Sequence, residues 1–113
     1  MSDFDNYKDY ILNKLDERTM LEQLAEEASE LSQAALKLIR AKGLSENVTP
    51  RTEQEAALAL AEEIMDCCIV IDLVCAKNWE VVSAIQENNF ANDDDIESNP
   101  KWKRWAERLG YED

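Results

Sequence analysis

The sequence contains no histidine and very little glycine or proline. The absence of histidine from 113 residues excludes Ser-His and Cys-His nucleophilic pairs and most zinc sites. Glycine and proline occur only twice each. A β-sandwich or β-barrel needs many tight turns, which use these two residues, so their scarcity favours an all-α fold. A chain of this length is typical of one domain, and we expect residues 1–113 to form a single domain.

Positive charge is also scarce. The chain has 12 Lys and Arg against 25 Asp and Glu, a net charge of −13. Such a chain repels DNA, RNA and anionic lipid, so we expect neither a nucleic-acid nor a membrane partner. The same charge attracts divalent cations, and these ions allow an acidic protein to bind a polyphosphate.

Long apolar segments and paired cysteines are lacking as well. The first residues are polar and acidic, unlike a signal peptide. The longest apolar run contains Asp66 and Asp72 and is too short to span a bilayer. Cys67, Cys68 and Cys75 have no CxxC spacing, and their apolar surroundings predict buried, reduced thiols. These features together predict a cytoplasmic protein.

Apolar residues at intervals of three and four predict about five helices in an antiparallel bundle. Asp3 is expected to cap the first helix, Thr19 to cap the second in a capping box with Glu22, and Gly43 to end the second. Thr49 and Pro50 resemble the start of a third helix. The expected helices cover residues 3 to about 16, 19–42, 50–77, 79–90 and 100–110.

The third expected helix is apolar on all sides between residues 64 and 76, apart from Asp66 and Asp72. Such a helix is buried centrally or covered by a partner subunit. A chain this short has few other helices to cover it, so we expect a homo-oligomer. Asp72 points away from Asp66, and we expect it to pair with a basic residue of a neighbouring chain or to contact substrate.

Two helices each carry a pair of carboxylates three residues apart, Glu27 with Glu30 and Glu63 with Asp66. Each pair lies on one helical face and can converge on one ion. A hairpin that turns near residues 46 and 47 places Glu27 level with Asp66 and Glu30 level with Glu63. Four carboxylates from two facing helices suit a divalent cation, either Mg²⁺ or Mn²⁺.

Glu27 also lies within the apolar sector of its helix, which is expected to centre near Leu24, Ala28 and Leu31, and Glu30 lies at its edge. An unpaired buried carboxylate costs free energy or becomes protonated, whereas coordination to a metal keeps it charged. The orientation of Glu27 therefore favours a metal site over a set of solvated surface acids.

The segments Glu26–Leu31 (EEASEL) and Ala61–Asp66 (AEEIMD) resemble the EExxE…ExxD signature of the MazG-like, all-α nucleoside triphosphate pyrophosphohydrolases. The resemblance covers about residues 19 to 92. It implies a dimer or tetramer that hydrolyses a nucleoside triphosphate to the monophosphate and pyrophosphate, and so cleans or rebalances a nucleotide pool. By family position, Glu27, Glu30, Glu63 and Asp66 would be the catalytic Mg²⁺ ligands.

Further site residues are expected to bind phosphate or activate water. Lys37 lies two turns beyond Glu30 and is a candidate phosphate ligand. Asn89 best matches an asparagine of the family, but the basic residue that often follows it is absent. We expect Lys101 or Arg104 of the last helix to take the place of this missing basic residue. The attacking water would be activated by an acid of the cluster or by Glu26.

The main alternative is a non-catalytic helical interaction module in which the acidic cluster is structural. A third reading is hydrolysis of a related pyrophosphate, such as phosphoribosyl-ATP or an alarmone. For the aromatic residues Trp102 and Trp105, helical spacing favours packing in a core or an interface over stacking on a base.

Overall fold

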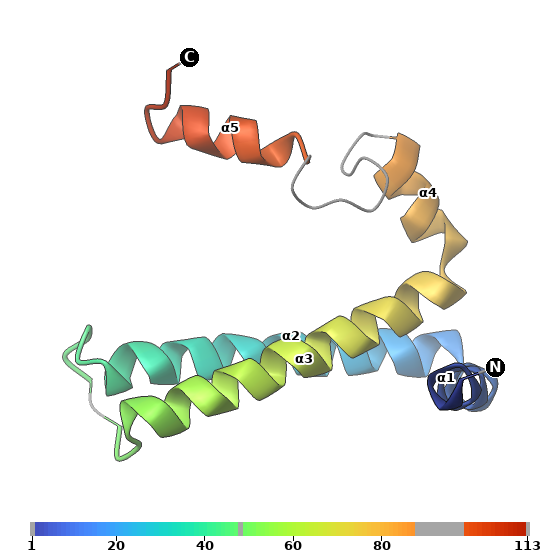
Figure 1. Cartoon of the computed structure of the whole chain (residues 1–113), viewed down its shortest axis with the longest axis horizontal. Helices are drawn as coiled ribbons and strands as arrows, with labels where there is room; N and C mark the ends of the chain where they lie inside the picture. The colour runs from blue at the N-terminus through green and yellow to red at the C-terminus, as the bar shows by residue number, and fades with distance from the viewer. Residues whose placement is uncertain (1, 48, 88–98, 113) are drawn as a thin grey trace. The chain divides into compact units, whose positions relative to one another are not determined.

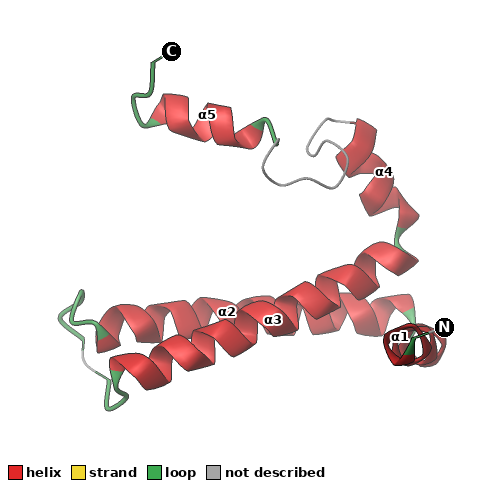
Figure 2. Cartoon of the chain, in the orientation of Figure 1, coloured by secondary structure: helices red, strands yellow, loops and turns green. Residues whose placement is uncertain are grey.

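A computed structural model describes residues 2–47, 49–87 and 99–112. These described residues form α-helices and loops with no β-strand, which confirms the all-α prediction (Figures 1 and 2). The five helices are α1 (Asp3–Lys14), α2 (Glu17–Ala41), α3 (Glu53–Lys77), α4 (Trp79–Glu87) and α5 (Lys101–Arg108).

The chain divides into two compact units. The first unit ends at Lys77 and holds α1, α2 and α3, while the second begins at Asn78 and holds α4 and α5. The expectation that residues 1–113 form a single domain therefore stays a prediction. The candidate site lies wholly in the first unit.

The first unit is built around an antiparallel hairpin of α2 and α3, which lie side by side (Figure 1). At one end, Met20 of α2 is 1% exposed and packs with Val70, Leu73 and Val74 of α3. Residues of α1 and Leu24 cover this cluster. At the other end, Lys42 Nζ and Glu53 Oε1 are 2.9 Å apart. The hairpin therefore has the register expected from the sequence.

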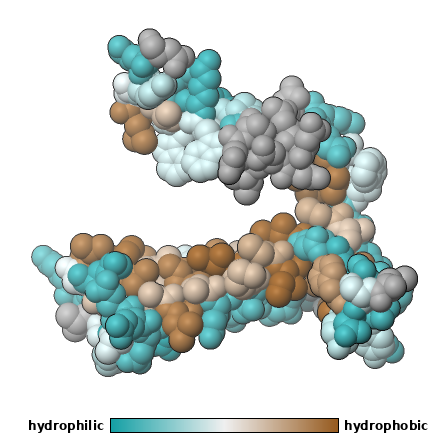
Figure 3. Space-filling model, in the orientation of Figure 1, coloured by the Kyte–Doolittle hydropathy of each residue, from teal (hydrophilic) through white to brown (hydrophobic). Residues whose placement is uncertain are grey.

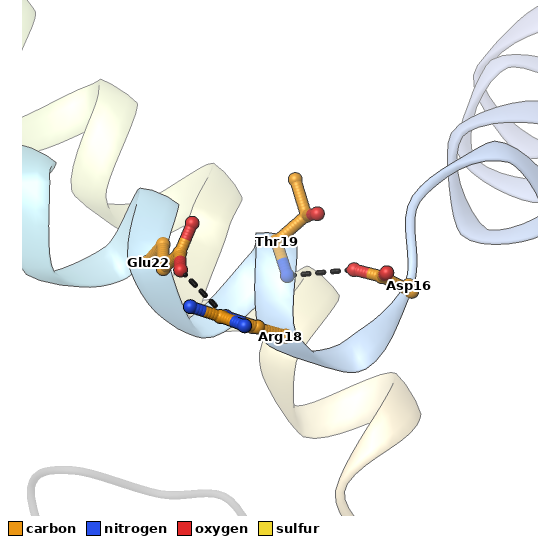
Figure 4. A network of polar contacts seen from close by, with 4 residues as sticks. All are labelled: Asp16, Arg18, Thr19 and Glu22. Carbon is orange, nitrogen blue, oxygen red and sulfur yellow. Dashed lines mark hydrogen bonds and ion pairs between the residues drawn. The ribbon is translucent and has the colours of Figure 1, made fainter.

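The helix starts differ from those expected. Ser2, and not Asp3, caps α1 in a capping box with Asp5. Asp16 caps α2 by accepting a 2.7 Å hydrogen bond from the Thr19 N–H (Figure 4), so the predicted capping box at Thr19 is wrong. Each true cap lies upstream of the predicted one, because an earlier side chain already satisfies the free backbone N–H groups.

The start of α3 is displaced in the other direction. The helix begins at Glu53, three residues after the expected Pro50. Thr52 Oγ1 accepts a hydrogen bond of 3.1 Å from the Glu55 N–H. A Thr followed by Glu three residues later is itself a capping signature, and it outweighs the Thr-Pro pair before it.

The predicted end of α2 at Gly43 is confirmed. Gly43 has a φ of 72°, which favours glycine. Its N–H donates to the carbonyl of Arg40, and the Leu44 N–H donates to the carbonyl of Ile39. This pair of bonds is a Schellman motif. The end of α3 at Lys77 also agrees with the prediction, whereas the expected end of α4 at residue 90 lies outside the described residues.

The single chain does not bury α3 on all sides, and the expected cover by a partner subunit stays a prediction. Its inner face, which includes Cys67 and Val70, is buried. Its outer face is exposed at Leu58 (63%), Met65 (59%) and Ile69 (56%). Figure 3 shows apolar surface along the hairpin. A hairpin partner covers only one side of a helix, so burial of the other side needs a further element.

The structure also bears on three smaller expectations. Cys68 is exposed and Cys75 half-buried, although all three cysteines are free thiols as predicted. Asp72 pairs with Lys8 of α1, with Lys8 Nζ and Asp72 Oδ2 2.7 Å apart, and its expected contact with a neighbouring chain or a substrate stays a prediction. Trp102 and Trp105 are each more than half exposed, and the packing expected for them in a core or an interface stays a prediction. We find no helix among the described residues that could cross a membrane.

Candidate metal centre

Three of the predicted acids meet between α2 and α3. Glu27 projects from α2, and Glu63 and Asp66 project from successive turns of α3. One carboxylate oxygen from each lies within 4.8 Å of the other two. The common position follows from the hairpin register, since residues level with each other on facing helices bring their side chains to one place.

Glu27 occupies the packed stripe of α2. This stripe runs through Met20, Leu24, Leu31 and Ala34, while Ala28, expected near its centre, is exposed. The stripe is therefore rotated by about one residue from its expected position, which moves Glu27 toward its middle. Packing against α3 determines which face of α2 is buried, because Ala28 is too small to bury much apolar area.

Neighbouring polar groups hold Glu27 in place. Gln23 Nε2 donates a 3.0 Å hydrogen bond to Glu27 Oε1 from the preceding turn. The buried Cys67 thiol donates a 3.4 Å bond from α3 to the Glu27 carbonyl oxygen. These bonds orient one carboxylate oxygen and fix the distance between the two helices. They also leave the second carboxylate oxygen, Oε2, available for a ligand.

Among the described residues, two carboxylate oxygens in the centre accept no hydrogen bond from a donor group. Glu27 Oε2 and Glu63 Oε2 are both buried, and neither has a hydrogen-bond partner among the described residues. Burial raises the pKa of Glu63 above its ordinary value, and the charge of Glu30, a side-chain hydrogen bond with Glu27 and the charges of Glu27 and Asp66 raise it further. A bound cation would relieve both the desolvation and the repulsion, so the residues present fit a divalent metal.

The donor set indicates which metals are suitable. All three converging groups are carboxylates, and the oxygen ligands that they offer suit Mg²⁺ or Mn²⁺. The thiol of Cys67 is not among the converging groups, and burial is the main cause that raises its pKa. A protonated thiol is a poor ligand, so a soft metal is not favoured here.

The fourth predicted ligand, Glu30, lies beside this group. It is exposed on α2 and is close enough to Glu63 for its charge to raise the pKa of that residue. Glu30 is not one of the three acids that meet within 4.8 Å. Its role as a ligand therefore stays a prediction. Glu26, the alternative for activating water, is exposed one residue before Glu27.

A cleft of about 190 Å³ adjoins the acids. Glu30, Gln33 and Lys37 line it from α2, Glu63 lines it from α3, and Arg51 lines it from the segment before α3. The structure thus brings the predicted phosphate ligand Lys37 to the same cleft as two acids. Gln33 and Arg51 were not expected from the sequence. Gln33 shares a face with Glu30 and Lys37, but no local pattern indicates where Arg51 lies.

The remaining predicted residues are not in the first unit. Lys101 and Arg104 lie on α5, where they line a hollow together with Trp105. Asn89 lies outside the described residues. The interpretation of the centre therefore depends on the residues of α2, α3 and the segment that joins them.

A scan of protein-family models and searches of curated proteins and of solved structures found no match to this chain. The class that the fold and the site define is an all-α protein with an acidic centre between two antiparallel helices. The resemblance of its two acidic motifs to the MazG-like enzymes remains a prediction from the sequence.

Proposed function

We propose that this protein is a Mg²⁺-dependent nucleoside triphosphate pyrophosphohydrolase that acts between the α and β phosphates. The observation that carries the proposal is the convergence of Glu27, Glu63 and Asp66, in which two buried carboxylate oxygens accept no hydrogen bond from the part of the chain that the structure describes. The same three acids belong to the two motifs that resemble those of the MazG-like enzymes, and this resemblance supports the proposal.

The proposed reaction needs no histidine. Glu27, Glu63 and Asp66 would hold the cation, with Glu30 as a further ligand. The cation would supply neutralisation of phosphate charge and a lower pKa for the attacking water. A carboxylate of the centre orients the water and accepts its proton. The water oxygen bonds to the α phosphorus, and the bond from that phosphorus to the bridging oxygen breaks. Pyrophosphate leaves with the electron pair.

Product analysis tests the reaction. The purified protein is incubated with each common ribonucleoside and deoxyribonucleoside triphosphate and Mg²⁺, and monophosphate, pyrophosphate and orthophosphate are measured. We expect monophosphate and pyrophosphate in equal amounts. Orthophosphate alone would show that a different bond is cut. No product from any nucleotide would contradict the proposal and favour the interaction module.

The substitution Glu63→Gln tests the site. It removes a charged ligand at nearly constant volume, so we expect turnover to be lost, by 100-fold or more as an order of magnitude, while the helical content is unchanged. The matched control is Glu62→Gln, because Glu62 is the adjacent residue of α3 and is exposed. Full activity in Glu63→Gln would remove this residue from the site.

A further inference from the structure

We infer that the cleft beside the acids binds the two terminal phosphates of the substrate through Arg51 and Lys37, and so selects triphosphates over diphosphates. The inference rests on the proposed function and adds the orientation of the substrate. Glu63 belongs to the acidic centre and also lines the cleft, so the centre adjoins the cleft at this residue. Lys37 and Arg51 line the same cleft.

The two cations reach the cleft from different elements. Lys37 is half-buried on α2, and Arg51 is exposed in the segment between α2 and α3. Within the described part of the chain, neither forms an ion pair, whereas Lys8, Arg18 and Lys42 each pair with an acid. In a chain of net charge −13, two unpaired cations at one cleft are suited to an anion.

The cleft fits phosphate groups better than a whole nucleotide. Pockets that enclose a drug-sized ligand usually measure about 300–1,000 Å³, and this cleft measures about 190 Å³. Two alanines, Ala34 and Ala59, complete its lining, and their small side chains leave the space open. Its polar lining also suits phosphate, since Gln33 adds hydrogen-bond donors and acceptors to the two cations.

Cations at this position would favour cleavage between the α and β phosphates. Negative charge develops on the leaving pyrophosphate as the bond breaks, and charge-assisted hydrogen bonds from arginine and lysine stabilise that charge. A triphosphate offers two phosphates to the cleft, whereas a diphosphate offers one. The loss of one cation should therefore harm the hydrolysis of triphosphates more than that of diphosphates.

The experiment compares Arg51→Gln and Lys37→Gln with the control Arg18→Gln. Arg18 is exposed at the start of α2 and pairs with Glu22 (Figure 4), so its substitution makes the same change of charge away from the cleft. Inorganic pyrophosphate with Mg²⁺ is the binding probe, measured by titration calorimetry. We expect affinity to fall roughly 10- to 100-fold in each cleft variant and to stay unchanged in Arg18→Gln.

Steady-state kinetics provide the second readout. In the wild-type protein kcat/KM should be higher for a nucleoside triphosphate than for the matching diphosphate, and Arg51→Gln should reduce this ratio by about tenfold or more. Binding of pyrophosphate at the wild-type affinity by both cleft variants, or an unchanged ratio, would overturn the inference. A wild-type protein that cleaves no nucleotide would instead overturn the proposed function, while the pyrophosphate titration would still test the cleft.

Discussion

At the scale of single residues, Glu27 is the most informative side chain. It is packed between Leu24 and Leu31 on α2, yet one of its carboxylate oxygens is buried without a partner among the described residues. Buried polar atoms are almost always paired, and a bound cation or an ordered water would pair this one. Glu27 therefore links the packing of the hairpin to its proposed chemistry.

If Glu27 binds a metal ion, the substitution Glu27→Gln should change both the stability of the metal-free protein and its response to Mg²⁺. Without metal, Glu27→Gln should raise the free energy of unfolding by about 1–3 kcal/mol, because a buried unpaired charge is removed. Mg²⁺ should stabilise the wild-type protein against heat, and this gain should vanish in the variant. Thermal unfolding with EDTA and with excess Mg²⁺ measures both effects. Glu26→Gln, an exposed neighbour, is the control, and it should keep the full response to Mg²⁺.

Asp16 supports a prediction about pH. Hydrogen bonds from Thr19, with its side chain as the larger cause and its backbone N–H as the next, lower the pKa of Asp16 below its ordinary value of 3.8. The carboxylate therefore stabilises the folded state fully above the unfolded pKa, and this contribution is lost as the pH falls through the lowered folded value.

The measurement compares wild type, Asp16→Ala and Asp16→Asn by thermal unfolding at pH 7 and near pH 3. At pH 7, Asp16→Ala should lower Tm by several degrees because α2 loses its N-cap. Asp16→Asn retains a capping side chain and should lower Tm less. Near pH 3 the difference between wild type and Asp16→Ala should shrink. An equal difference at both pH values would show that the charge of Asp16 contributes nothing.

At the scale of elements, the ends of the two long helices determine where the cleft residues lie. The Schellman motif at Gly43 turns the chain out of α2, and Thr52 starts α3. Arg51 lies between these two points and reaches the cleft only if both ends form as described. The local hydrogen bonds of the helix termini thus position a residue of the proposed substrate site.

Substitution of Gly43 tests the backbone conformation at the end of α2. Gly43→Ala should destabilise the protein by about 1 kcal/mol, because a φ of 72° strains a residue with a side chain, although the space around it is open. Gly43→Asn should cost less, because asparagine tolerates this conformation better. Urea unfolding measures both changes. Equal stability of the two variants would contradict an origin in backbone conformation.

At the scale of the whole molecule, the outer face of α3 is an apolar surface that the single chain leaves exposed. Leu58, Met65 and Ile69 are exposed and lie on one helical stripe. Contiguous apolar surface of this kind is typical of a subunit interface. The expected homo-oligomer, a dimer or tetramer, therefore stays our prediction for this face.

Sedimentation at several concentrations tests the assembly. We expect a dimer or tetramer for the wild-type protein and a shift toward monomer for Ile69→Asp, because a charge in an apolar interface is costly. Leu109→Asp changes an exposed leucine of the second unit and is the control. A wild-type protein that sediments as a monomer at all concentrations would contradict the prediction.

The sequence by itself determined the all-α class, the pairing of α2 with α3 and the level at which Glu27 faces Asp66. These features depend on interactions between residues three or four apart and on the position of one loop, which are local properties of the chain. The end of α2 was predictable for the same reason, since glycine is the residue that the left-handed turn at Gly43 requires.

The tertiary structure was needed to show which face of α2 is packed and that Arg51 lies at the cleft. The caps of α2 and α3 are local hydrogen bonds, but the sequence offers more than one candidate for each. Several local alternatives were nearly equivalent here: Ala28 or Glu27 near the middle of the stripe, Thr19 or Asp16 as the cap. For the stripe, only contacts between segments far apart in the sequence separate the alternatives, because burial depends on what each face meets.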